Sequence, residues 1–386
     1  MYTLSIHKIT IFTVSIFLWL LLSPYIIWER NYIYAVFFSI SLLTFFLYIS
    51  NKLINVTSFI LSTIIVFLIF IFMGLNGASV GWSIITSFTI FILLLYSEQD
   101  INKIFQIFKL IFTLSLIPSM ILWILHIIGL DITSLAIRIQ EAPNAMKIAA
   151  DQYYLIFPGA STLNYMIESP ILRLQGMYDE PGVVGTIGGL ILIADQINLK
   201  KKLNIIIFIA GLMSLSLAFY VIVTIYYLMY SKKYYKYFLV SFSIMFLIFI
   251  SLPHAKQQFI EEKTIAKIGI TDNFDIKGRG TVNSVNWDNW KNSYTKEFLL
   301  GLSNTILDGS SSYKNVFIKS GYIGMLLIFI IYSLIFIKSK HQIHYHDVIF
   351  IFIFILSFIQ RPYIVTPYHI LIFIYAMQRP KPKKLI

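Results

Sequence analysis

Residues 56–75 read VTSFILSTIIVFLIFIFMGL, a run of twenty residues without a single charged side chain. As a helix, about 20 such residues are long enough to cross the hydrocarbon core of a bilayer. The whole chain has the same character, since 58% of its 386 residues are hydrophobic, only 12% are charged, and the mean hydropathy is +0.78. Soluble domains carry about twice that share of charge. The chain is therefore expected to be an integral membrane protein whose outer surface faces lipid.

Similar apolar runs recur along the chain. We expect helical spans at 9–28, 32–50, 56–75, 80–97, 104–129, 181–199, 203–231, 238–253, 313–337, 347–360 and 363–378. The run 203–231 is long for one helix, and Ser214-Leu215-Ser216 near its middle is placed to form a turn between two shorter crossings. The fold expected is an all-α polytopic membrane protein in which residues 1–386 form a single integral membrane domain.

The placement of lysine and arginine decides between one and two crossings in 203–231. With two crossings and the N-terminus inside, fifteen Lys or Arg residues fall on cytoplasmic segments, whereas the short outer loops hold only Arg30 and Arg361. Cytoplasmic loops carry such an excess. We therefore expect twelve spans with both termini cytoplasmic. The excess basic residues that give the net charge of +12 thus lie at the cytoplasmic surface, where they contact anionic lipid headgroups. This distribution argues against nucleic acid as a partner.

Two segments, 130–180 and 254–312, are too long and too polar to be simple connectors. In the twelve-span topology both lie outside the cytoplasm. The first carries three basic and six acidic residues, and the second carries seven of each. Both are rich in aromatic residues, which disordered linkers avoid. We expect both loops to fold onto the outer face of the membrane and to hold the functional residues.

The first loop ends at Asp179-Glu180-Pro181. Proline suits the first position of a helix, and carboxylates just before it stabilise the positively charged end of the helix dipole. Under this purely structural interpretation, both acids serve only to start the helix. The functional interpretation is that one of them acts as a general base. Gly185 and Gly189 follow at a spacing that permits close helix packing in membranes.

The second loop carries Gly278-Arg279-Gly280, then Trp287 and Trp290, then Asp308 and Tyr313. Glycine on both sides of Arg279 lets the backbone approach a ligand closely, although a solvated surface turn has the same pattern. Trp287 and Trp290 share one face if this stretch is helical. They fit an interfacial aromatic belt, or a platform on which sugar rings stack.

Other classes of site have little support in the sequence. The chain has no cysteine, so disulfides and thiolate ligands or nucleophiles are excluded. The sequence also lacks a metalloprotease helix motif, a P-loop and a serine hydrolase elbow, so no metal and no cofactor are expected. Few charged residues lie well inside the expected spans, Lys109 and Asp195 among them, which argues against an ion-coupled transporter.

At these two loops the chain resembles the O-antigen polymerases of the Wzy type, in the superfamily that includes the O-antigen ligases. The similarity rests on Arg173 through Gly182, on Gly278-Arg279-Gly280 followed by the tryptophans and Gly301, and on Asp308 through Gly324. The ligase branch is expected to have histidine where this chain has Lys314 beside Asn315, which favours the polymerase branch.

The resemblance implies a metal-independent membrane glycosyltransferase of GT-C-like architecture, in the bacterial inner membrane with its active site at the periplasmic face. Such an enzyme polymerises undecaprenyl-pyrophosphate-linked O-antigen repeat units. It transfers the growing glycan chain to the non-reducing sugar of a new lipid-linked unit, and both donor and acceptor are lipid-linked oligosaccharides. Membrane lipid and a separate chain-length regulator are the further partners that the resemblance implies.

The resemblance also implies roles for individual residues. Arg173 and Arg279 are expected to grip the pyrophosphate leaving group, because guanidinium groups bind phosphate oxygens in a bidentate way. Asp179, Glu180 or Asp308 would accept the proton of the acceptor hydroxyl.

The remaining residues expected to contact substrate share an outer-face position in the twelve-span topology. They are His254, Trp287, Trp290, Asp308, Tyr313 and Arg361. An O-antigen ligase and a lipid-linked oligosaccharide flippase remain the alternatives. A flippase would need charges lining a path through the bundle, whereas a polymerase needs chemistry in its outer loops.

Overall fold

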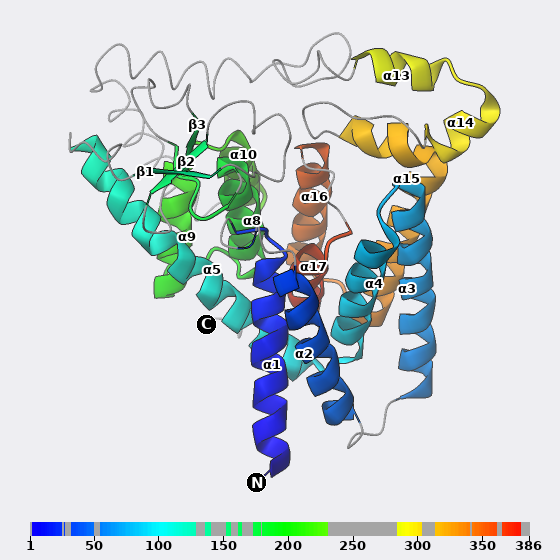
Figure 1. Cartoon of the computed structure of the whole chain (residues 1–386), viewed down its shortest axis with the longest axis horizontal. Helices are drawn as coiled ribbons and strands as arrows, with labels where there is room; N and C mark the ends of the chain where they lie inside the picture. The colour runs from blue at the N-terminus through cyan, green and yellow to red at the C-terminus, as the bar shows by residue number, and fades with distance from the viewer. Residues whose placement is uncertain are drawn as a thin grey trace.

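The computed structural model describes residues 2–24, 27, 32–49, 55–128, 136–139, 152–155, 161–163, 173–178, 180–230, 284–302, 313–339, 342–360 and 365–379. Within them the chain is a bundle of helices (Figure 1). The first half holds α1 (Tyr2–Leu20), α2 (Tyr32–Ile49), α3 (Val56–Leu75), α4 (Val80–Leu95) and α5 (Glu98–Ile127). The second half holds α8 (Pro181–Ala194), α9 (Lys202–Met213), α10 (Leu217–Tyr230), α13 (Ser284–Lys291), α14 (Thr295–Leu300), α15 (Tyr313–Ser339), α16 (Tyr345–Gln360) and α17 (Pro367–Gln378).

Four helices of the described chain are long and apolar enough to cross a membrane, at Tyr32–Ile49, Val56–Leu75, Glu98–Leu125 and Tyr313–Ser339. Their outer faces expose large apolar side chains such as Leu43, Phe67 and Phe329. Water would penalise so much exposed apolar surface, whereas lipid does not. The expectation of a helical membrane protein is confirmed, and the count of twelve spans stays a prediction.

Several expected spans are shorter than the sequence indicated. α8 has 14 residues, α9 has 12, α10 has 14 and α17 has 12. At about 1.5 Å per residue such helices are roughly 18–21 Å long, against about 30 Å for the hydrocarbon core. The expected span 238–253 lies outside the described residues. The bundle thus combines long helices with short ones, of which α8 and α17 are largely buried by other helices.

The break expected within 203–231 is confirmed at residues 214–216. α9 ends at Met213 and α10 begins at Leu217. Leu215 takes a positive φ of 47°, and the Ser214 hydroxyl donates to the Gly211 carbonyl at 2.6 Å. Serine competes for backbone hydrogen bonds, which suits a helix end. The chain is thus two helices here and not one.

The close packing expected at Gly185 and Gly189 is also confirmed. A Cβ atom on Gly185 would lie 2.3 Å from the Cβ of Ser216, and one on Gly189 would lie 3.0 Å from Ile222. α8 therefore contacts α10 with its backbone, at a distance that only small residues allow.

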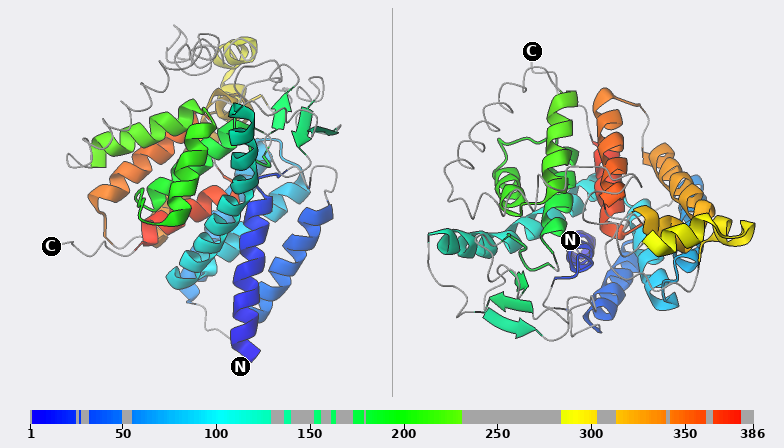
Figure 2. Two further views of the ribbon diagram at one scale, coloured as in Figure 1. Left: turned by 90° about the vertical axis from the view of Figure 1, so that its left-hand side faces the viewer. Right: turned by 90° about the horizontal axis from the view of Figure 1, so that it is seen from above.

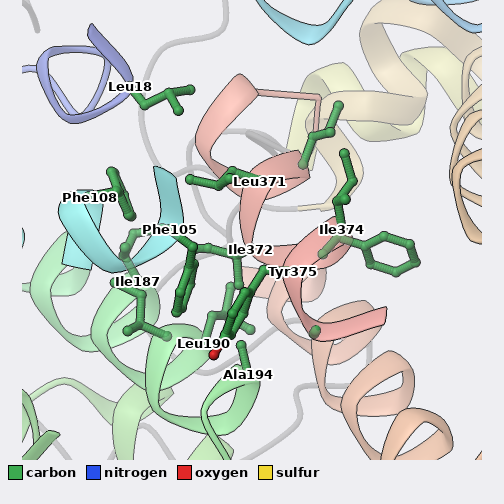
Figure 3. Close-up of a cluster of buried hydrophobic side chains, with 14 of the residues drawn as sticks. Leu18, Phe105, Phe108, Ile187, Leu190, Ala194, Leu371, Ile372, Ile374 and Tyr375 are labelled. Atoms are coloured by element: carbon green, nitrogen blue, oxygen red, sulfur yellow. The ribbon is translucent and has the colours of Figure 1, made fainter. Parts of the chain in front are cut away.

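The centre of the bundle is formed by α17 with α5 and α8 (Figure 3). Phe105 of α5 stacks on Tyr375 of α17 with ring centroids 3.6 Å apart. Ile187 and Leu190 of α8 and Ile372 of α17 are fully or almost fully buried around this pair. The apolar side chains of the short helices α8 and α17 are thus buried by contacts with other parts of the protein.

A small antiparallel sheet in the first long loop corrects the all-α expectation. Its strands are β1 (Ala136–Ile139), β2 (Gln152–Leu155) and β3 (Ser161–Leu163), in the order β1-β2-β3. Ile137 pairs with Tyr154, and Tyr153 pairs with Thr162. Isoleucine, tyrosine and threonine favour strands, a local preference that the span-based prediction did not weigh.

The parts of the two long loops that are described lie at one end of the bundle, away from the N-terminus of α1. Figures 1 and 2 show β1–β3, α13 and α14 at this end. We call it the loop end. The two loops expected to carry the functional residues therefore emerge on the same side.

Candidate functional site at the loop end

Arg173 closes the turn between α9 and α10. Its Nε donates to the carbonyl of Ser214 at 3.2 Å, and its Nη2 donates to the carbonyl of Leu215 at 2.9 Å. The next residue repeats the attachment, because the Leu174 amide donates to the Met213 carbonyl at 3.1 Å. These carbonyls end α9 and have lost their helical partners. They fix the guanidinium in place, and being neutral they leave its positive charge intact.

Tyr178 anchors the same segment to the bundle. Its side chain is fully buried, and its hydroxyl lies 2.8 Å from the Ser115 hydroxyl of α5. The Trp19 indole of α1 donates to the same hydroxyl at 3.1 Å. Burial raises the pKa of Tyr178 well above its ordinary value, so the phenol is neutral and does not serve as a base. The residue holds α1, α5 and the start of α8 in register.

Gly176 makes this anchoring possible. Its φ is +67°, a conformation that residues with a side chain rarely adopt. A Cβ atom there would also lie 3.1 Å from a methyl carbon of Leu116. The glycine therefore allows the chain to pass close to α5 and to turn Tyr178 inward.

Glu180 occupies the N-cap of α8, and Pro181 follows within the first turn, as the structural interpretation of this motif predicted. The Glu180 side chain is half-buried and makes no capping hydrogen bond to the helix. Its carboxylate is placed at the positive end of the helix dipole, which favours the charged form. Asp179, the other candidate base of this motif, lies outside the described residues.

Six aromatic side chains gather in the second loop and the start of α15. This aromatic cluster consists of Trp287 and Trp290 of α13, Phe298 of α14, and Tyr313, Phe317 and Tyr322 of α15. Trp287 and Trp290 lie on one helix face, as predicted, with ring centroids 4.9 Å apart. Phe298 stacks on Trp290 at 5.1 Å. The cluster is the small hydrophobic core of a unit built from three helices.

The two tryptophans differ in what they offer a ligand. Trp290 is only 2% exposed, so it does not form an open stacking platform and its predicted contact with substrate is not supported by its position. Trp287 is half-buried, and the Lys314 ammonium lies 5.0 Å from the centre of its ring. Tyr313 is also half-buried, and the centroid of its ring lies 6.2 Å from that of Trp287. Trp287, Tyr313 and Lys314 thus bring an indole, a phenol and a cation together.

Two glycines join this unit to the membrane helix. Gly321 interrupts α15 with φ 59° and ψ −161°, and Gly301 after α14 has φ 85°. A Cβ atom on Gly321 would lie 2.2 Å from the Leu299 carbonyl oxygen, and one on Gly301 would lie 2.3 Å from the Lys319 backbone. The two backbones are therefore in direct contact, which no residue other than glycine permits.

Comparisons of the chain with models of known protein families, with curated proteins and with solved structures found no match. The geometry must therefore be interpreted on its own terms. Among the described residues, no three His, Asp or Glu side chains come together in a way that could hold a metal ion.

The predicted site residues are only partly within the described chain. Arg173, Glu180, Trp287, Trp290 and Tyr313 are described, and they fall into two groups, one at the α8 start and one in the aromatic cluster. The other predicted site residues lie outside the described part: Asp179, His254, Arg279, Asp308 and Arg361.

A buried charge cluster lies at the other end of α8, and only Lys109 and Asp195 among its members were identified from the sequence. Asp195 accepts hydrogen bonds from Lys109 at 2.9 Å and from Lys201 at 2.8 Å. Asn204 donates to the same carboxylate at 2.9 Å, and Tyr375 donates at 3.1 Å. Lys109 and Asp195 stood out as charges in apolar runs, and a charge in such a setting needs a partner. Their pairing was the missing inference, and it ties α5, α8, α9 and α17 together.

Proposed function

We propose that this chain is a membrane glycosyltransferase that polymerises undecaprenyl-pyrophosphate-linked oligosaccharide units at the loop end. The motifs that resemble those of O-antigen polymerases include several glycines, among them Gly176, Gly301 and Gly321. In the described chain only Gly77 joins them as a glycine with positive φ. The motif positions therefore coincide with backbone positions that require glycine, and this observation carries the proposal.

A second observation supports the same proposal. Two separate parts of the motif set, Gly301 and the Gly321 region, lie within van der Waals contact, since a Cβ on Gly321 would be 2.8 Å from the Gly301 nitrogen. The described part of the first motif is attached to α5, because Tyr178 hydrogen-bonds to Ser115 and Gly176 lies close to Leu116. A transferase needs such rigid supports, because reacting groups must be held in place before the reaction.

The proposed step is a glycosyl transfer. The bond between the anomeric carbon of the donor chain and the pyrophosphate oxygen breaks, and the pyrophosphate leaves with the electron pair. The acceptor hydroxyl oxygen forms the new glycosidic bond, and its proton passes to a carboxylate. Guanidinium and ammonium groups stabilise the negative charge that develops on the leaving group.

In this proposal Arg173 and Arg279 supply the positive charge, and Arg173 is held in position by the carbonyls of Ser214 and Leu215. Glu180 is the described candidate for the general base, with Asp179 and Asp308 as alternatives. Trp287 and Tyr313 offer aromatic faces to a sugar ring. The undecaprenyl chain remains in the lipid beside the bundle.

The test is deletion of the gene in a bacterium that makes a repeating surface glycan, followed by gel analysis of the glycans. The proposal expects the long ladder to disappear while a band of core plus one unit remains. Loss of every band above bare core would replace polymerase by ligase or flippase.

Point variants then test the residues. Glu180→Gln is compared with Glu98→Gln, because both carboxylates lie at a helix start but Glu98 is exposed at the opposite end of the bundle. Arg279→Lys keeps the charge and removes the bidentate geometry. We expect Arg279→Lys and Glu180→Gln to shorten or remove the ladder, and Glu98→Gln to leave it unchanged. Equal ladders in all three variants would remove these residues from the mechanism.

A further inference from the structure

The unit formed by α13, α14 and the first segment of α15 (Tyr313–Ser320) stands at the edge of the bundle. α13 and α14 pack mainly on α15 and on each other. Figure 1 shows the first segment of α15 lying across the end of the bundle, whereas the rest of α15 runs along α3. α14 projects outward beyond α3 in the same view. The outer face of α3 exposes Phe59, Ile60 and Phe67, so the space beside it is lipid.

Several large apolar side chains of α14 and its N-cap are not covered by the described chain, and Lys296 and Glu297 of the same helix are exposed beside them. Tyr294 is 88% exposed, and Leu299 and Leu300 of α14 are also exposed. Water-facing loops rarely present such a group together, because each exposed apolar side chain loses the stabilisation of burial.

The exposed residues of α14 continue directly into the lipid-facing side of α15. Phe298 contacts Tyr322 with ring centroids 4.7 Å apart, and Tyr322 is itself half exposed. Leu326 and Phe329 follow Tyr322 after four and seven residues, on the same helix face, and both are exposed. One apolar surface thus runs from the membrane span around the Gly321 kink onto α14.

Charge complements this surface. The described parts of the unit, residues 284–302 and 313–320, hold Lys291, Lys296, Lys314 and Lys319 against Asp288 and Glu297. Lysine around an apolar face, together with tryptophan and tyrosine, is the composition of helices that lie in the headgroup region of a bilayer.

We infer that the α13–α14 unit is a membrane-interface anchor, whose Tyr294, Leu299 and Leu300 insert into the lipid leaflet at the loop end. The exposed Lys291 and Lys296 contact lipid phosphates, and the Gly321 kink turns α15 from the span into the plane of the interface. This anchor fixes the height of the aromatic cluster above the hydrocarbon core. It does not depend on the reaction that the protein catalyses.

The chain has no cysteine, so single-cysteine variants report one position without background. Leu300→Cys, Phe329→Cys and Asn289→Cys carry a nitroxide spin label in protein reconstituted into phosphatidylethanolamine–phosphatidylglycerol vesicles. Phe329 is the control within the span, and the exposed, polar Asn289 on α13 is the control for water. Relaxation by oxygen, which concentrates in lipid, is compared with relaxation by a water-soluble nickel chelate.

The expected oxygen-to-nickel ratio is highest at position 329, intermediate at 300, and several-fold lower at 289 than at 300. A ratio at 300 equal to that at 289 would place α14 in water and overturn the inference. Shielding of position 300 from both reagents would also overturn it, because protein and not lipid would then cover the face. Tyr294→Cys gives an independent second reading if Leu300→Cys does not fold.

Discussion

Replacing Asp195 with asparagine is expected to destabilise the protein more than any other single change in the buried charge cluster. Asparagine has the same shape but no charge. Lys109, which is 1% exposed, would then have only uncharged acceptors, the new amide oxygen and the Asn204 side-chain oxygen at 3.3 Å. Lys201 loses the same partner, but its side chain is 44% exposed and water replaces the carboxylate. Removing one partner of a buried ion pair costs about 3–5 kcal/mol, because the other charge is left buried.

The reverse substitution, Lys109→Met, is expected to cost less. Asp195 would keep its hydrogen bonds from Lys201, Asn204 and Tyr375. The loss is then that of one hydrogen bond to a charged group, about 1.5–3 kcal/mol. In the double variant both buried charges are gone, so its stability should be close to that of Lys109→Met alone. The cycle would then give a coupling energy of about 3–5 kcal/mol in favour of the pair, equal to the cost of Asp195→Asn.

Thermal unfolding of the detergent-solubilised protein, followed by loss of the monodisperse chromatographic peak, gives the ranking. Lys103→Met is the matched control, since it also lies on α5 but its side chain is 54% exposed and 4.0 Å from Asp100. A surface pair of this kind contributes about 0–1 kcal/mol. The reasoning is refuted if Asp195→Asn is no more harmful than Lys109→Met, or if the double variant is as unstable as Asp195→Asn.

Three further changes test other parts of the structure. Gly321→Ala should destabilise the protein by more than about 1 kcal/mol, because alanine disfavours a positive φ and its Cβ would overlap a carbonyl oxygen. The control Gly74→Ala should have no effect in the same melting assay, because Gly74 has open space around it. Tyr178→Phe should cost about 1 kcal/mol and shift the tryptophan emission spectrum, since two hydrogen bonds are lost, while Tyr294→Phe at an exposed position should change neither. Trp290→Ala should cost about 3–5 kcal/mol within the α13–α14 unit and make that unit sensitive to limited proteolysis; an unchanged digestion pattern would show that the aromatic cluster does not hold it together.

The sequence predicted features that depend on residues near one another in the chain. The turn at Ser214–Ser216, the helix start at Pro181 and the common face of Trp287 and Trp290 are all confirmed. Each follows from a local preference, such as serine at a helix end or proline in a first turn, and tertiary contacts reinforce it.

Features that depend on distant residues were not predictable in the same way. Hydropathy cannot distinguish a helix that faces lipid from one that faces protein, so 363–378 was expected to be a span like 56–75. The structure shows α17 as a short helix that is buried on almost all sides, which hydropathy alone does not indicate. The same limit applies to Trp290, whose burial depends on Phe298 and Tyr322, eight and thirty-two residues further along the chain.

The site shows the same division between local and distant contacts. The sequence singled out Arg173 for its charge, but its attachment to the Ser214 and Leu215 carbonyls joins segments about forty residues apart. Likewise Lys109 and Asp195 were identified as unusual, while Asn204 and Tyr375 carried no signal of their own. An asparagine or a tyrosine is informative only when its neighbour in space is known.

The position of α17 has a consequence for how the protein is made. This helix is the last one of the described chain, yet it packs against α1, α4, α5, α8, α15 and α16. A ribosome therefore delivers every other described helix before the central one exists. Until synthesis reaches Pro367, the nascent chain has an apolar hollow at its middle, and Asp195 lacks the Tyr375 hydroxyl. Completion of the bundle consequently requires the synthesis of α17, and truncated chains that stop before α17 should be substrates for membrane proteases.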